Sequence, residues 1–146
     1  MEPPQARPGP TPCCPSFAGN AESAKAELLQ ARQQLETLRA EGDKATRIAT
    51  HLLLASSFLG DHAGVEREAA GLEPEIQRDA VGGPDLAQVV AIGRAQLGQT
   101  DAAITSLTHL LQTPGEGALT PALLRLDPLW DPLRNDPRFQ KLSGGQ

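Results

Sequence analysis

Apolar residues recur every three or four positions along most of the chain, which is the spacing of one face of an α-helix. The first such segment spaces its apolar side chains by four, three, four and three: Ala24, Leu28, Ala31, Leu35 and Leu38. Later segments share this periodicity, and most end near glycine or proline. We predict helices over residues 21–41, 43–59, 62–72, 84–97 and 101–112, with a further turn at 75–80. Asn20 and Asp43 are predicted to cap the first two helices.

A different pattern runs over residues 119–142, here called the closing segment, where a capping residue is followed by proline four times. Thr or Asp at a helix N-cap accepts hydrogen bonds from free N–H groups, and proline suits the first helical position. We therefore predict short helical turns beginning at Thr120, Asp127, Asp131 and Asp136. Because their apolar residues need a surface to cover, we expect them to close the end of the fifth helix as a cap. The residues of this predicted cap are Asp127, Trp130, Asp131, Leu133, Asp136 and Phe139.

Proline is concentrated at the start of the chain, with six prolines between Pro3 and Pro15. This density blocks helix formation and leaves no apolar face, so we expect residues 1–19 to be a disordered extension. The helical domain then covers residues 20–142, and residues 143–146 form a flexible tail.

The composition favours an all-α protein. The chain of 146 residues has no tyrosine and only 3% aromatic residues, and it is rich in Ala and Leu. Such a composition favours helices over sheets. The net charge is −5 with no basic run, which argues against nucleic-acid binding. No segment approaches the roughly 18 apolar residues of a membrane span, so we expect a cytoplasmic protein without membrane contact.

No constellation of residues indicates catalysis, a cofactor or a metal. His51, His62 and His109 lie far apart in the sequence, without a second ligand at metal-binding spacing. Helix capping accounts for the aspartates of the closing segment. Ser56-Ser57 lacks the glycine-flanked turn of a hydrolase nucleophile. We therefore expect a non-enzymatic protein with no cofactor and no metal. The adjacent cysteines Cys13 and Cys14 do not have metal-ligand spacing and are expected to be free thiols.

Two parts of the helical domain are similar to each other at an offset of 38 residues, which aligns Leu59-Gly60 with Leu97-Gly98. Apolar positions on both sides of these two turns also align. Each unit consists of two predicted helices joined by a Leu-Gly turn. Helices this short and alanine-rich do not bury their apolar faces alone, whereas stacked units would share one continuous core.

The second unit resembles the second half of a tetratricopeptide repeat (TPR), and the first unit resembles a degenerate copy. The matching residues are Leu97, Gly98, Ala103, Leu107, Leu110 and Pro114. The closing segment is similar to the tail of TPR arrays in bacterial serine/threonine kinases, adenylate cyclases and winged-helix regulators. This resemblance covers residues 43–142 and implies a short TPR-like helical-hairpin solenoid with a C-terminal cap. The enzymatic motifs of those larger proteins are missing from this sequence.

In TPR arrays the first helix of each unit lines a concave face, and the resemblance places eight residues there. They are Arg47, Thr50, Leu54, Ser57, Asp85, Gln88, Ile92 and Ala95. The Lys, Asn and Arg side chains with which some family members hold a peptide C-terminus are missing. What the resemblance implies is a mildly apolar groove for a helix or an extended peptide. Trp130 and Phe139 are alternative partner anchors, although a closing role favours their burial.

Two interpretations of function follow from these features. The first is a scaffold for protein–protein interaction, whose partner is a protein or peptide. The second is a C-terminal fragment of a larger bacterial signalling protein that serves only as the terminus of its repeat array. Since the first helix and the cap can cover the two ends of the array, we expect a monomer.

Overall fold

The computed structural model describes residues 17–42, 45–114 and 118–144, and within these residues all regular structure is helical. The predicted all-α class is therefore confirmed. The elements are α1 (Phe17–Ala40), α2 (Thr46–Phe58), α3 (His62–Arg78), α4 (Gly83–Gln96), α5 (Thr100–Gln112), α6 (Pro121–Leu126), the 3-10 helix η1 (Pro128–Leu133) and α7 (Pro137–Leu142).

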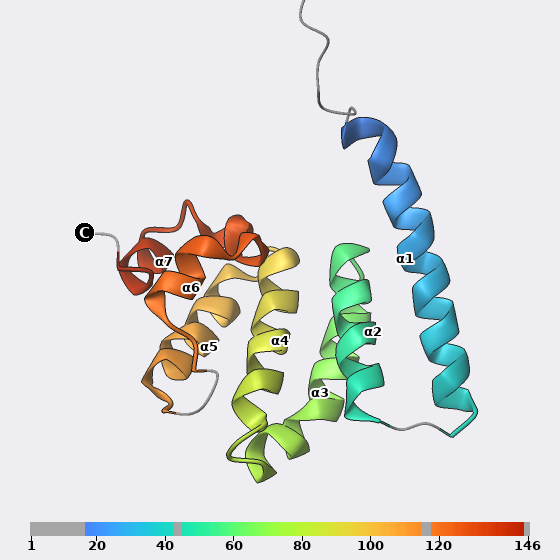
Figure 1. The fold of residues 1–146 in the computed structure, drawn as a ribbon, viewed down its shortest axis with the longest axis horizontal. Coiled ribbons are helices and arrows are strands. Elements are labelled where there is room, and N and C mark those ends of the chain that lie inside the picture. Colours follow the sequence, from blue (N-terminus) through green and yellow to red (C-terminus); the bar gives the residue numbers. More distant parts are fainter. Residues whose placement is uncertain (1–16, 43–44, 115–117, 145–146) are drawn as a thin grey trace, which may run out of the picture.

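Helices α1 to α5 follow one another across the molecule, with α1 at one edge (Figure 1). Helices α2 and α3 pack together as one hairpin, and α4 and α5 pack together as another. Helix α4 also contacts both helices of the first hairpin. The closing segment lies over the second hairpin, where η1 contacts α4 and α7 contacts α5. Helix α4 is therefore the central element, because it joins both hairpins to the closing segment.

The turns of the two hairpins share one backbone conformation. Gly60 and Gly98 both have φ +75°, in the left-handed region that glycine enters without strain. In each turn, the residue after the glycine donates its N–H to the carbonyl five residues earlier. These bonds run from Asp61 N to Ser56 O and from Gln99 N to Arg94 O, both at 2.9 Å. The glycine N–H donates to the carbonyl three residues back, which completes a Schellman cap in both turns.

Two clusters of the buried core meet along α4. The first cluster joins the first hairpin to α4: Leu53, Val65, Ala69, Leu72 and Val90. The second cluster joins α4 and α5 to the closing segment: Ala91, Ile92, Ala95, Ala103, Ile104, Leu107, Leu110, Leu119, Leu124, Trp130, Leu133 and Phe139. Adjacent residues Val90 and Ala91 thus belong to different clusters, so α4 is apolar on more than one side.

Side chains of the closing segment cap its short helices, with one correction at Asp131. Three residues accept a backbone N–H as predicted: Thr120 from Leu123, Asp127 from Leu129 and Asp136 from Arg138. Asp131 does not cap a helix. It lies inside η1 and pairs with Arg134, because Pro128–Leu133 forms one 3-10 helix rather than two separate turns. Trp130, Leu133 and Phe139 are buried, as predicted.

The end of the domain also differs from the prediction. Ser143, which we assigned to a flexible tail, is buried. Its carbonyl accepts a hydrogen bond from Arg125 Nη1 at 2.9 Å, so the backbone stays attached to α6 beyond the last helix. The last two residues of the chain lie outside the described part.

The first two helices begin at positions that the sequence analysis did not predict. Helix α1 starts at Phe17, so Asn20 lies inside it instead of capping it. The remainder of the predicted Pro-rich extension, residues 1–16 with both cysteines, lies outside the described part of the chain. Helix α2 starts at Thr46, and its predicted cap Asp43 also lies outside the described residues.

Helix α3 continues through Pro74, where we predicted an interruption. Proline removes one backbone donor and crowds the carbonyl four residues earlier, which belongs to Ala70. Ala70 and Pro74 are both exposed, so water can solvate that carbonyl. Leu72 and Ile76 still pack on the core from the opposite side of the helix. Packing on α4 therefore outweighs the local preference of proline to end a helix.

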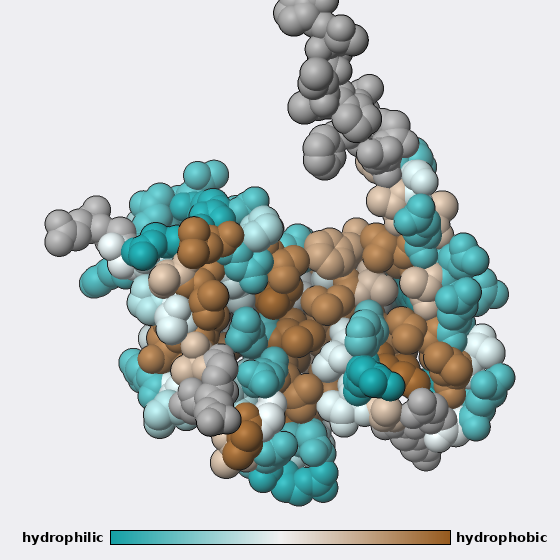
Figure 2. All heavy atoms as spheres, viewed as in Figure 1, coloured by the Kyte–Doolittle hydropathy of each residue, from teal (hydrophilic) through white to brown (hydrophobic). Residues whose placement is uncertain are grey.

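The apolar stripe of α1 is only partly covered by α2. Leu28 and Leu35 are half-buried, whereas Leu38 is 45% exposed and Ala24 and Ala31 are exposed. Helix α1 has 24 residues and α2 has 13, so the first turns of α1 extend beyond the end of α2 (Figure 1). Figure 2 shows hydrophobic side chains at the surface where α1 and α2 meet. The predicted packing of this stripe on α2 is thus incomplete.

Two arginines of α1 add ionic contacts to the first hairpin. Arg32 Nη1 lies 2.9 Å from the carboxylate of Asp61. Arg39 donates to both carboxylate oxygens of Glu68, and Arg67 donates to one of them. Burial raises the pKa of the Glu68 carboxyl, but the hydrogen bonds and charges of Arg39 and then Arg67 outweigh it. The pKa of Glu68 therefore lies below its ordinary value, and its buried carboxylate is ionised at neutral pH.

Candidate functional site

The eight residues predicted to line a concave face all lie on α2 and α4, but they differ in exposure. Arg47 and Asp85 are exposed, and Thr50, Leu54 and Gln88 are half-buried. The other three, Ser57, Ile92 and Ala95, are buried. These eight residues therefore do not form one accessible surface.

Packing of the closing segment explains part of this difference. Ile92 and Ala95 belong to the same core cluster as the closing segment, which lies over this part of α4. Gln96 Nε2, one residue further along, donates to Leu129 O at 2.7 Å. Ser57 Oγ donates to the carbonyl of Leu54 in its own helix. Of the four predicted positions on α4, only Asp85 and Gln88 are not buried.

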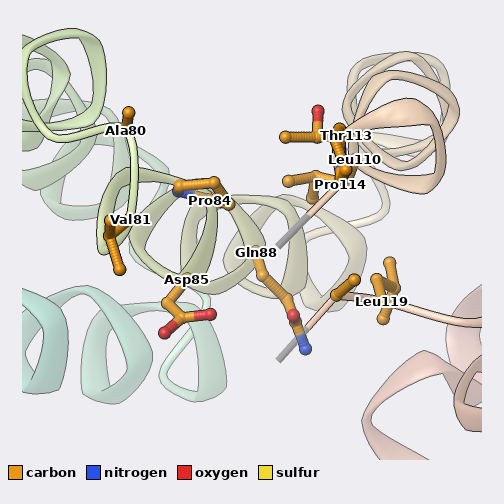
Figure 3. Close-up of a pocket in the computed structure, with 10 residues that line it drawn as sticks. Ala80, Val81, Pro84, Asp85, Gln88, Leu110, Thr113, Pro114 and Leu119 are labelled. Carbon is orange, nitrogen blue, oxygen red and sulfur yellow. The ribbon is translucent and has the colours of Figure 1, made fainter. Parts of the chain in front are cut away.

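A pocket with a volume of about 290 Å³ opens beside the beginning of α4. Helix α4 begins at this end of the second hairpin and α5 ends there, so the segments before α4 and after α5 both border the pocket (Figure 3). The lining residues come from these segments and helix ends: Ala80, Val81, Pro84, Asp85, Gln88, Leu110, Thr113, Pro114, Ala118 and Leu119. Residues 115–117 of the same connection lie outside the described part of the chain.

Of these ten residues, the sequence analysis assigned only Asp85 and Gln88 to a binding face. The sequence nevertheless indicates both irregular segments. Residues 82–84 are Gly-Gly-Pro and residues 113–115 are Thr-Pro-Gly, and both combinations end helices. In a hairpin of two helices, the start of the first and the end of the second lie at the same end. The two breaks, combined with this geometry, are the sequence signal that could have located the pocket.

The walls of this pocket are mainly apolar. Its polar groups differ in whether they already have a hydrogen-bond partner within the protein. Thr113 Oγ1 donates to His109 O at 3.0 Å, so its hydroxyl is already used. Asp85 and Gln88 form no side-chain hydrogen bond or ion pair within the described residues. The pocket therefore combines apolar walls with a carboxylate and an amide that are free to bind a ligand.

Two other hollows differ from this pocket, because charged side chains that line them are already paired. One lies among α1, α2 and α3, and its charged residues Arg39, Arg67 and Glu68 already pair with one another. The other lies between α5 and α7, where Arg138 is paired with Asp101 and Asp136. In both hollows the arginines already have carboxylate partners. The pocket beside α4 is therefore the better candidate site.

Trp130 and Phe139 do not form a surface anchor. Their exposed fractions are 0% and 2%, and both belong to the second core cluster. The indole Nε1 of Trp130 has no hydrogen-bond partner in the described structure. The alternative that these two aromatic residues bind a partner directly is therefore wrong for the folded chain.

The described residues contain no group of three or more His, Cys, Asp or Glu side chains that could hold a metal ion. Within the same residues, no helix has the length and apolar character needed to cross a membrane. Comparison of the chain with models of protein families found no match, and searches of curated proteins and of solved structures found none. The assignment of a function therefore depends on the geometry of the chain itself.

Proposed function

We propose that this chain is a non-enzymatic, TPR-like module for protein–protein interaction in the bacterial cytoplasm. Two hairpins with equivalent Leu-Gly turns, 38 residues apart, support the repeat interpretation. The packing of α4 against both α2 and α3 supports it too, because stacked hairpins in a solenoid bury their faces against the preceding unit. Equivalent turns and neighbour-to-neighbour packing are the features that a short helical-hairpin solenoid requires.

The observation that carries the binding role is the pocket beside the start of α4. Binding sites are usually concave and mainly apolar, with a few polar groups that orient the ligand. This pocket has both properties, and two of its polar side chains, Asp85 and Gln88, are without partners in the described structure. Its volume is near the lower end of ligand pockets, which run from about 300 Å³ upward. A short peptide segment that inserts a side chain fits this size.

An alternative role has a separate observation in its favour. The closing segment buries Trp130, Leu133 and Phe139 against the second hairpin, as the terminal element of a repeat array must. On this interpretation the chain is the C-terminal part of a larger bacterial signalling protein and has no partner of its own. The two roles predict different outcomes in one binding experiment.

The experiment is a selection of peptides from a random heptapeptide library, displayed on phage, against the purified chain. A blocked variant, Ala80→Trp, places a large ring at a position that lines the pocket. A matched control, Ala122→Trp, places the same ring at an exposed position on α6 that does not line it. We expect peptides that bind the wild type and the control, and bind the blocked variant at least tenfold more weakly.

Each outcome decides between the two roles. Enriched peptides that compete for one site and are excluded by Ala80→Trp support the interaction module. A selection that enriches no peptide above background contradicts a binding role and favours the array terminus. ATP hydrolysis, kinase or cyclase turnover that survives rigorous purification would contradict both, because neither contains a catalytic site.

A further inference from the structure

The pocket beside α4 presents two free oxygen acceptors on one side of the same helix. Asp85 and Gln88 are three residues apart, a spacing that brings side chains to neighbouring positions on a helix. Figure 3 shows both side chains leaving the same side of α4, with the Gln88 amide between Asp85 and Leu119. Neither side chain has a hydrogen-bond or salt-bridge partner among the described residues. A ligand that enters here meets the Asp85 carboxylate beside the Gln88 amide oxygen.

The surroundings of these acceptors favour a cation with an apolar stem. Pro84, Leu110 and Leu119 provide apolar walls, along which the methylene groups of a long basic side chain can pack. The head group of such a side chain can form a charge-assisted hydrogen bond with the exposed Asp85 carboxylate. An acidic ligand would be repelled by Asp85. A purely apolar ligand would cover Asp85 and Gln88 without giving them partners, which costs binding free energy.

The geometry also distinguishes arginine from lysine. A guanidinium presents several N–H donors in one plane, so it can reach a carboxylate and a neighbouring amide oxygen together. An ammonium is a compact, strongly hydrated charge that gains less from two fixed acceptors. The net charge of −5 for the whole chain favours the approach of basic peptides.

We propose that this pocket binds an arginine side chain of a partner peptide, with the guanidinium on Asp85 and Gln88 and the stem on Pro84 and Leu119. This inference rests on the proposed function, and it adds the chemistry by which the partner is recognised. Flanking residues of the peptide lie over the pocket rim, where Val81 is 78% exposed.

The test repeats the heptapeptide selection on three forms of the full chain: wild type, Asp85→Asn, and the control Glu22→Gln. Asp85→Asn keeps the side-chain size and removes the charge in the pocket. Glu22→Gln removes the same charge from an exposed position on α1, which does not line the pocket. Thermal melts followed by circular dichroism check that all three forms are folded.

One selected peptide is then synthesised with arginine, citrulline or lysine at the enriched position, and its affinity is measured by fluorescence polarisation. Citrulline keeps the shape of arginine and removes its charge. We expect arginine to be enriched on the wild type and on Glu22→Gln, but not on Asp85→Asn. Affinity should fall at least tenfold with citrulline and at least fivefold with Asp85→Asn, and lysine should lie between arginine and citrulline.

The failure of this inference can be separated from the failure of the proposed function. Peptides that lack arginine, or that bind Asp85→Asn as well as the wild type, overturn the arginine assignment. If Ala80→Trp still excludes those peptides, the interaction module stands without it. A library that yields no binding peptide overturns both.

Discussion

At the scale of single residues, Trp130 is the side chain whose removal should matter most. It is the largest fully buried side chain and packs where the closing segment meets the second hairpin. We expect Trp130→Ala to lower the free energy of unfolding by about 3–5 kcal/mol, as large-to-small core substitutions do. That loss is a large share of the roughly 5–15 kcal/mol that stabilises a typical domain. Urea unfolding followed by far-UV circular dichroism measures it.

The control for this substitution lies in the same segment. Leu126 is 77% exposed, so Leu126→Ala should change stability by less than about 0.5 kcal/mol. Because the Trp130 Nε1–H has no partner in the described structure, Trp130→Phe should lose much less stability than Trp130→Ala. Equal stability of Trp130→Ala and Leu126→Ala would show that the ring is not part of the core in solution.

The buried carboxylate of Glu68 predicts a pH dependence. Its folded pKa is depressed, because the hydrogen bonds and charges of Arg39 and Arg67 outweigh the effect of burial. A depressed pKa contributes stability above the unfolded value of about 4.3, and this contribution is lost as the pH falls through the folded pKa. Glu68→Gln should therefore cost about 1.5–3 kcal/mol at pH 7, the usual range for hydrogen bonds to charged groups.

Urea unfolding of wild type and Glu68→Gln between pH 7 and pH 3 tests this prediction. The difference in stability should shrink as the pH falls below about 4.3, since the wild-type carboxyl is then progressively protonated. Glu73 is exposed on the same helix, and Glu73→Gln should change stability by less than about 0.5 kcal/mol throughout. A difference for Glu68→Gln that grows on acidification would contradict the assigned direction of the pKa shift.

At the scale of elements, three glycines should respond to alanine in different ways. Gly98 ends α4 at φ +75°, and a Cβ added there would meet no atom within 4 Å, so its cost is purely conformational. We expect Gly98→Ala to destabilise by about 1–2 kcal/mol, the cost of the left-handed region for other residues. Gly71 lies inside α3 with equally open space, so Gly71→Ala should stabilise by about 0.5–1 kcal/mol.

Gly93 gives the third response, because α4 approaches the first hairpin closely there. A Cβ at Gly93 would overlap Leu53 Cδ2, so Gly93→Ala should destabilise by overpacking, by about 1–3 kcal/mol. Thermal unfolding of each variant, compared with the wild type, measures its change in stability. Shifts of the same sign for Gly71→Ala and Gly98→Ala would mean that backbone conformation does not distinguish the two positions.

At the scale of the whole molecule, the two core clusters meet along α4 within one chain, and the closing segment completes the second. We therefore expect a monomer of 15.4 kDa in light scattering coupled to size-exclusion chromatography. Helix α1 nevertheless leaves apolar residues uncovered, since Leu29 and Leu38 are 50% and 45% exposed. A dimer that dissociates on Leu35→Glu would instead show that a second copy covers the α1 stripe.

Much of the architecture was predictable because it depends on neighbours in the sequence. Apolar spacing predicted the helices, the Leu-Gly pairs predicted the ends of α2 and α4, and Asp-Pro predicted most of the turns in the closing segment. Each signal acts over a few residues, through helix periodicity, the conformational freedom of glycine and the N–H groups that a cap satisfies. The candidate site was predicted only through Asp85 and Gln88.

Tertiary structure decided what depends on residues distant in the chain. Arg39 pairs with Glu68, 29 residues away, and no local pattern selects that partner. Packing on α4 keeps α3 helical through Pro74, and the closing segment buries Ile92 and Ala95, which the repeat resemblance had placed on an open face. The pocket forms where the start of α4 meets the connection after α5. Its existence depends on how two hairpin ends converge in space, which local propensities do not determine.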